Sequence, residues 1–212
     1  MNEQKFYYSS LRGRLLGSKA REHLILKEIE SLSKKDFFAD IGCAQGHYLK
    51  KAFEKTPNVF GLDFDFKKLG QITDSKRFEL VNASAEETPF ASNSFDFVLC
   101  SEVLEHLPSW KKGLAELKRI CRKKIVVTIP LEKSLFWRNF SKFAPMPTRG
   151  HLHRLESKDI ESEMPGWILE KKIFVHTPSR HLNGLLGKRV SEKKAMYSFL
   201  VFKKKQKSRS KK

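Results

Sequence analysis

Cysteine is scarce in this 212-residue chain, and no stretch of it stays apolar for long. Its cysteines, Cys43, Cys100 and Cys121, are odd in number and lack metal-like spacing, which argues against a disulfide framework. No run approaches the roughly 18–20 apolar residues that a helix needs to cross a bilayer. The N-terminal region is polar and basic, so we expect neither a membrane span nor a signal peptide. These features favour a reducing, cytoplasmic setting.

Acidic residues are also in short supply. The chain has 42 Lys and Arg residues against 24 Asp and Glu residues, a formal net charge of +18. The block 203–212 holds seven basic residues and no acidic one. Such a block is normally solvated and disordered, and it could bind RNA, DNA or an anionic membrane surface, or serve only as a solubilising tail. Net charge bears on partners and solubility rather than on fold.

What the chain does contain is typical of a folded α/β protein. Hydrophobic residues make up 40% of it, and phenylalanine occurs 17 times. Short runs rich in β-branched and aromatic residues predict strands at 37–41, 58–62, 78–82, 95–100, 124–129, 167–175 and 195–202. Helical stretches are expected between them, at 46–55, 66–72 and 109–121. This alternation implies a mostly parallel sheet with helices on both faces.

Composition divides the chain into three parts. We expect residues 1–35 to form a basic helical segment, with an amphipathic helix or helix pair at 11–32. Residues 36–203 form the main domain, and 204–212 a basic disordered tail. Within the domain, 131–166 reads as an insertion or lid over the acceptor site. Its aromatic stretch 135–143 is equally compatible with contact to a membrane or with plain packing.

The end of the first predicted strand carries a nucleotide-binding pattern. The run Asp40 to Gly46 reads DIGCAQG, and its small residues let the backbone turn tightly and approach a ligand. Asp63, at the end of the second strand, is well placed to accept both hydroxyls of a ribose. The glycines could also form an ordinary strand-to-helix turn, and Asp63 could be a capping residue. The combination of strand, loop, helix and acid favours the nucleotide.

Further motifs separate this chain from the dinucleotide dehydrogenases. The last glycine falls one residue too early for G-x-G-x-x-G, and Ala44 takes the central position. Downstream come the runs NASAEETPF at 82–90, SFDFV at 94–98 and SEVLEHL at 101–107. Together these motifs resemble the class I methyltransferases, in particular the type 11 family, over about residues 36–130. The resemblance implies a Rossmann-like, doubly wound, mostly parallel seven-stranded sheet whose last strand is antiparallel.

The resemblance also implies a cofactor, S-adenosyl-L-methionine, which would leave as S-adenosyl-L-homocysteine. The residues that it implies for the cofactor site are Asp40, Gly42, Cys43, Ala44 and Gly46 at the methionine part, Asp63 at the ribose, Phe64, Ser84 and Ala85 at the adenine, and Cys100 through its backbone. Two positions depart from the family pattern: Ala44 stands where many relatives have Gly, and Ser84 where they usually have Asp. Ser84 can accept a hydrogen bond without charge assistance, so cofactor affinity would be modest.

Catalytic residues are less evident. His106 could act as a base in the acceptor cleft, although a structural role as a helix cap is favoured. His151 and His153 look like a metal pair, but no carboxylate or thiol cluster completes a site in the sequence, so no metal is expected. As in many relatives, they could line the acceptor pocket instead. Cys100 and Cys121 read as core residues rather than nucleophiles.

These features lead to one main hypothesis and two alternatives. The main hypothesis is methyl transfer, by in-line displacement, to an O, N or C atom of a small-molecule or lipid-like acceptor. The run 100–103 lacks the Asn/Asp-Pro-Pro-Tyr signature of exocyclic amino methylation. One alternative is an RNA methyltransferase that uses the basic tail and a phosphate footprint made of Lys118, Arg119, Arg122, Lys123 and Lys124. The other is a non-catalytic scaffold or partner subunit that keeps the fold.

Overall fold

The computed structural model describes residues 18–73, 75–134, 150–175 and 191–205. The expected lid residues 135–149, the start of the N-terminal segment and most of the basic tail lie outside these ranges. The sheet consists of seven strands in the order β3-β2-β1-β4-β5-β7-β6. The strand bounds are β1 Phe38–Ile41, β2 Val59–Asp63, β3 Glu79–Asn82, β4 Phe95–Ser101, β5 Cys121–Pro130, β6 Trp167–Val175 and β7 Tyr197–Lys204.

Strand direction agrees with the prediction from the sequence. β1 pairs in parallel with β2 and β4, β2 with β3, and β4 with β5. β7 is antiparallel to both of its neighbours, β5 and β6. Because the parallel strands all point the same way, the loops that follow β1, β2, β3, β4 and β5 meet at one edge of the sheet. The mostly parallel, Rossmann-like fold with an antiparallel last strand is therefore confirmed.

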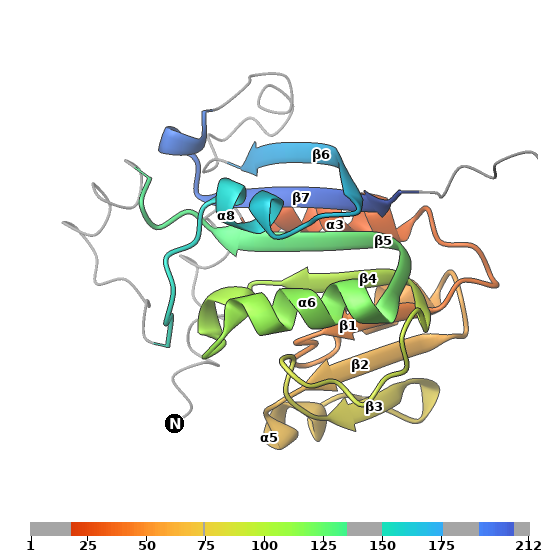
Figure 1. Cartoon of the computed structure of the whole chain (residues 1–212). Coiled ribbons are helices and arrows are strands. Elements are labelled where there is room, and N and C mark those ends of the chain that lie inside the picture. Colours follow the sequence, from red (N-terminus) through yellow and green to blue (C-terminus); the bar gives the residue numbers. More distant parts are fainter. Residues whose placement is uncertain (1–17, 74, 135–149, 176–190, 206–212) are drawn as a thin grey trace, which may run out of the picture.

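Helices cover both faces of the sheet. Figure 1 shows α6 (Trp110–Ile120) and α8 (Ser157–Ser162) in front of the sheet and α3 (Ser18–Ile29) behind it. α4 (His47–Phe53) contacts α3 and β2, while the short α5 (Phe66–Leu69) contacts β2 and β3. Three 3₁₀ turns complete the elements, η1 (Ser75–Arg77), η2 (Leu104–His106) and η3 (Glu192–Lys194).

The central strands separate two apolar cores. Along β4, Val98 and Cys100 face the core that includes α6, whereas Phe97 and Leu99 face the core that includes α3 and α4. This alternation explains why β4 reads as an unbroken apolar run: both of its faces are buried. The edge strands β3 and β6 carry more exposed and polar residues.

α6 shows how the sequence specifies one of these layers. The side chain of Ser109 accepts a hydrogen bond from the backbone N–H of Lys112 and caps the first turn. Leu114, Leu117 and Ile120 recur at helical spacing and are fully buried against the sheet. Among the residues that the structure describes, no helix is both long and apolar enough to cross a membrane.

Candidate active site

The loop after β1 is a tight turn built from left-handed residues. Gly42, Ala44 and Gly46 have φ values of 83°, 47° and 74°. The backbone N–H groups of Gly42 and Cys43 donate to the carbonyl of Leu62 at 2.7 and 3.0 Å, which fixes the loop to the end of β2. The alternating small residues are thus needed by the backbone itself, and Ala44 adopts the same left-handed region as the glycines.

Asp63 fastens this loop from the neighbouring strand. One oxygen of its buried carboxylate accepts from the N–H of Ala44 at 2.8 Å, and the other accepts from the N–H of Asp65 at 2.8 Å. Each carboxylate oxygen retains a second lone pair, so Asp63 can still accept hydrogen bonds from a ligand diol. Sequence reasoning predicted the ligand role and named a capping role as the alternative; these two contacts to backbone N–H groups are of that structural kind.

Phe64, directly after Asp63, is presented to solvent. Its side chain is 81% exposed, which is unusual for a large apolar residue. The amide of Asn82 donates to the carbonyls of Asp63 and Phe64, both at 2.9 Å, and holds this turn in place. The exposed ring is therefore available to pack on a flat ligand group.

A second carboxyl group is buried next to Asp63. The side chain of Asp40 lies at the end of β1, and its pKa is raised to about 8 by burial and then by the charge of Asp63. Two acids in one low-dielectric site favour a ligand that carries positive charge. A cofactor with an ammonium and a sulfonium group meets that requirement.

The remaining predicted cofactor residues lie further along the same edge. Ser84 follows β3, and its hydroxyl accepts from the N–H of Glu86 at 3.1 Å. The side chains of Ala85 and Cys100 are buried in the core with α6, so only their backbones could face a ligand. Burial raises the pKa of the Cys100 thiol well above its usual range, which agrees with a core residue rather than a nucleophile.

The loop after β4 packs directly onto the loop after β1. A Cβ atom on Gly42 would lie 2.2 Å from Cγ2 of Val103, so the two loops touch where only glycine fits. Glu102 has a left-handed φ of 57° and forms an ion pair with Arg21 of α3 at 3.0 Å. These contacts join the predicted cofactor loop to the segment that carries His106.

His106 and His151 come together although they lie 45 positions apart. Their rings meet edge to face with centroids 4.5 Å apart. The backbone N–H groups of Leu152 and His153 both donate to the carbonyl of Glu105, at 2.8 and 3.1 Å, which holds the two segments together. Burial lowers the pKa of His106, so its neutral form is favoured.

Glu105 and Glu132 also belong to this group, and sequence reasoning made no prediction for either. Glu105 is fully buried between His106 and the α6 core, and Glu132 follows β5 and contacts Nδ1 of His151. A usable signal was present, because β4 and β5 are parallel neighbours and the residues after each strand must lie close together. His153 is separate, with its Nε2 atom 3.2 Å from the carbonyl of Pro108.

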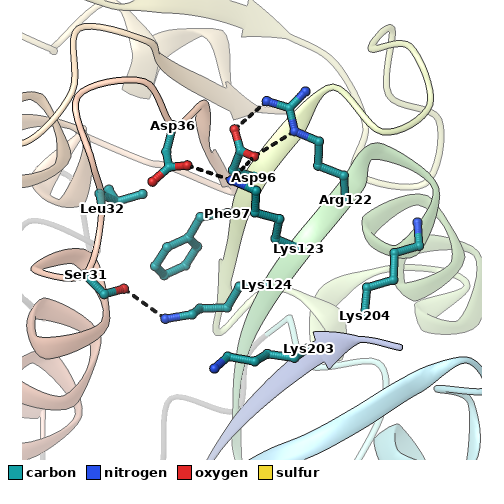
Figure 2. Close-up of a pocket in the computed structure, with 10 residues that line it drawn as sticks. All are labelled: Ser31, Leu32, Asp36, Asp96, Phe97, Arg122, Lys123, Lys124, Lys203 and Lys204. Carbon is teal, nitrogen blue, oxygen red and sulfur yellow. Dashed lines mark hydrogen bonds and ion pairs between the residues drawn. The ribbon is translucent and has the colours of Figure 1, made fainter. Parts of the chain in front are cut away.

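Three residues of the predicted phosphate footprint, Arg122, Lys123 and Lys124, line a surface pocket of about 450 Å³ at the opposite edge of the sheet. Figure 2 shows Arg122 and Lys123 both directed at Asp96, with Lys123 also reaching Asp36. Lys124 pairs with Glu28 at 2.8 Å. The other two residues of the footprint, Lys118 and Arg119, bond to the Glu163 carbonyl and to Glu116. All five cations thus have partners within the protein.

Two residues of the basic block 203–212 lie within the sheet. Lys203 and Lys204 end β7; Lys203 pairs with Glu170, and Lys204 donates to Asn93 at 2.7 Å. These two charges are tied to neighbouring strands and loops rather than to a free tail.

Comparisons with known proteins agree with this geometry. Residues 39–127 match the family model described as "Methyltransferase domain". An uncharacterised protein of Methanocaldococcus jannaschii is 36% identical over 119 residues, which is 53% of this chain and 48% of that protein. A demethylmenaquinone methyltransferase of Staphylococcus aureus is 29% identical over 137 residues, or 58% of this chain and 56% of the relative. The chain thus spans about half the length of these curated relatives.

A solved structure extends the likeness over nearly the whole fold. A methyltransferase from Archaeoglobus fulgidus, described as SAM dependent, superposes with a TM-score of 0.70 at 17% identity. The match covers 96% of this chain and all of that one, and at this identity it supports the fold alone. The matched residues 39–127 contain the loop after β1, Asp63 and the SEVLEHL segment, so this part of the chain is similar to the class I, type 11 methyltransferase domains.

Proposed function

We propose that this protein binds S-adenosyl-L-methionine and transfers its methyl group to a small-molecule or lipid-like acceptor. The observation that carries the proposal is the pair of buried acids, Asp40 and Asp63, around a loop of three left-handed residues. Asp63 would accept the ribose hydroxyls, and Asp40 would face the ammonium group. Phe64 would cover the adenine. Ser84 and, through its backbone, Ala85 would border the adenine, and the backbone of Cys100 would offer contacts near the amino group.

The reaction asks little of the protein beyond positioning. The cofactor supplies an electrophilic methyl carbon bonded to the sulfonium sulfur. As the acceptor atom forms a bond to that carbon, the carbon–sulfur bond breaks and its electron pair stays on sulfur. The chain would hold the two partners in line and exclude water. A base is needed only where the acceptor must lose a proton. His106, whose neutral form is favoured, and His151 stand at the edge where an acceptor would lie, and they are our candidates for that role.

The acceptor class rests on two further observations. The similar Staphylococcus protein is by name a demethylmenaquinone methyltransferase, so a ring-bearing lipid is one acceptor that the similarity supports. The cations of the predicted RNA footprint are occupied by internal partners, and this argues against phosphate recognition at that edge. Transfer of a labelled methyl group into a cell extract, with the product sorted into lipid, small-molecule, protein and nucleic-acid fractions, would separate these classes.

Cofactor binding is tested by replacing Asp63 with Asn. The amide keeps the size of the side chain but directs N–H groups towards donors, so affinity for S-adenosyl-L-homocysteine should fall about 10- to 100-fold. Isothermal titration calorimetry measures this change, and circular dichroism checks that the variant is folded. Asp65→Asn is the matched control, since Asn also caps a helix well and Asp65 caps α5.

Two outcomes would contradict the proposal. If the unaltered protein bound neither S-adenosyl-L-methionine nor S-adenosyl-L-homocysteine, the non-catalytic scaffold alternative would replace it. If Asp63→Asn bound as tightly as the unaltered protein, the ribose assignment would be wrong even though the cofactor is bound.

A further inference from the structure

Three potential metal ligands converge at the carboxyl edge of the sheet. One nitrogen each of His106 and His151 and one carboxylate oxygen of Glu105 all lie within 4.8 Å of one another. Ligand atoms that share an ion at about 2.1 Å lie at most about 4.2 Å apart. Closing the cluster around an ion therefore needs movements of less than about 1 Å. Glu105 and His106 lie on η2, which follows β4, and the backbone contacts of Leu152 and His153 with the Glu105 carbonyl bring His151 to them.

The burial of the Glu105 carboxyl group without a partner points to a cation. Its side chain has no exposed surface, and neither of its carboxylate oxygens has a hydrogen-bond partner among the residues that the structure describes. A buried carboxylate in this condition is strongly unfavourable unless a positive charge or a hydrogen-bond donor reaches it. The oxygens belong to the cluster with the two histidines, so an ion bound there would satisfy them.

The other carboxylates of the region already have partners. Glu102 is paired with Arg21 at 3.0 Å, and Glu132 contacts His151 and lies 3.6 Å from Arg154. Among the residues that the structure describes, none forms an ion pair with Glu105, and its neighbourhood is rich in negative charge. A divalent cation supplies the missing charge.

Hydrogen bonds orient both histidines as ligands. Nδ1 of His106 lies 2.9 Å from the carbonyl of Gly150, which can only accept, so Nδ1 carries the proton and Nε2 carries the lone pair. Nδ1 of His151 contacts the carboxylate of Glu132 in the same way. A carbonyl or carboxylate behind each imidazole is the arrangement that fixes the tautomer of metal-bound histidine in proteins.

We propose that Glu105, His106 and His151 bind a divalent first-row transition-metal ion, with Glu132 positioning His151. Two imidazoles and one carboxylate suit Mn²⁺, Co²⁺, Fe²⁺ or Zn²⁺ and leave coordination positions open. Val103, on the same loop, packs against Gly42 of the predicted cofactor loop. If the proposed function holds, an oxygen of the methyl acceptor would occupy one of the open positions. The ion would then favour the ionised form of that acceptor group.

The test uses metal alone on the full chain. Mn²⁺ is titrated into the protein, free Mn²⁺ is followed by electron paramagnetic resonance, and Co²⁺ absorption reports the ligand set. We expect one bound ion per chain. Glu105→Gln and His106→Gln should each abolish measurable binding, and Glu132→Gln should weaken it about 10- to 100-fold, as loss of a group behind a metal ligand does. His153→Gln is the matched control and should bind normally.

Thermal melting shows whether each variant is folded. His106→Gln is the variant least prone to misfolding, because the His106 ring is partly open to solvent. Absence of Mn²⁺ and Co²⁺ binding, or equal affinity in folded His106→Gln, would overturn the proposal. Titration with S-adenosyl-L-homocysteine on the same samples, without metal, reports on the proposed function separately, so the two can fail independently.

Discussion

Asp40 occupies a position where function and stability oppose each other. Its carboxyl group is buried at the end of β1 beside Asp63, and its pKa is raised to about 8. Between pH 3.8, the ordinary value for this side chain, and about 8, the folded protein holds a proton that the unfolded chain has released. Stability must therefore fall as the pH rises through this window.

Asp40→Asn removes that penalty. We expect the variant to be more stable than the unaltered protein at pH 8–9, on the order of a few kcal/mol, with the difference vanishing near pH 4. Urea unfolding across this pH range measures it. The same variant should bind S-adenosyl-L-methionine more weakly, because the cofactor's ammonium loses its counter-charge. A difference in stability that does not change with pH would show that the carboxyl group of Asp40 does not have a raised pKa in the folded protein.

At the scale of elements, the loops after β1 and β4 touch at Gly42 and Val103. Gly42 combines a φ of 83° with a space that Val103 already fills. A side chain at position 42 would meet two obstacles, a backbone penalty of about 1–2 kcal/mol and a steric one. Gly166, with a φ of 82° and nothing within 4 Å of an added Cβ, meets only the first.

This pair yields a comparison of matched variants. Gly166→Ala should cost about 1–2 kcal/mol of unfolding free energy, and Gly42→Ala clearly more. Val103→Ala combined with Gly42→Ala should recover part of the excess, as a double-mutant cycle by chemical denaturation can show. Equal losses at the two glycines would mean that the loops separate easily and that Val103 does not restrain the cofactor loop.

The elements themselves were largely predictable. The expected strands at 37–41, 58–62, 78–82, 95–100 and 167–175 each coincide with an observed strand to within one residue at either end. β5 begins three residues early, at Cys121, because α6 passes into it without a turn. β7 runs two residues past the prediction, since cross-strand pairing with β6 extends to Lys204 despite its polar sequence. Pairing of this kind depends on the neighbouring strand, so it cannot be predicted from the sequence of one strand alone.

The site was predictable only where its parts are close in sequence. Asp40, Gly42 and Asp63 follow from a local pattern of strand, turn and helix. The group formed by Glu105, His106 and His151 depends on which strands are neighbours and on a backbone contact from Leu152 to Glu105. Sequence reasoning paired His151 with His153, whereas the structure brings His151 to His106 and leaves His153 apart. The buried carboxyl group of Glu105 beside them was not predicted, because burial of an acid within the SEVLEHL run cannot be inferred from the sequence alone.

At the scale of the whole molecule, Glu28 joins elements that lie far apart in the chain. This buried residue of α3 pairs with Lys124 of β5 at 2.8 Å and with Lys171 of β6 at 2.6 Å. Burial alone would raise the pKa of Glu28, but the two lysines outweigh burial and lower it. The pairing therefore stabilises the protein above the ordinary glutamate range and is lost as the pH falls below about 4.5.

Glu28→Gln tests this connection. At pH 7 the variant should lose about 1–3 kcal/mol of unfolding free energy, because two lysines lose a charged acceptor. The difference from the unaltered protein should shrink as the pH is lowered through 4.5 and below, which guanidinium titrations at several pH values would show. Glu30→Gln, two residues away on an exposed side chain, is the control and should change little. A constant difference at every pH would contradict the charge-based explanation.

The position of β7 has a consequence for how the chain is made. β7 lies between β5 and β6, although it follows both in sequence. Until Tyr197–Lys204 has been synthesised, β5 presents an open edge whose centre is apolar, and β6 has no strand beside it. Open apolar edges are templates for pairing between chains. Nascent chains of this protein thus have a defined period of aggregation risk, which ends when the strand inserts, and slow translation of residues 176–196 would lengthen it.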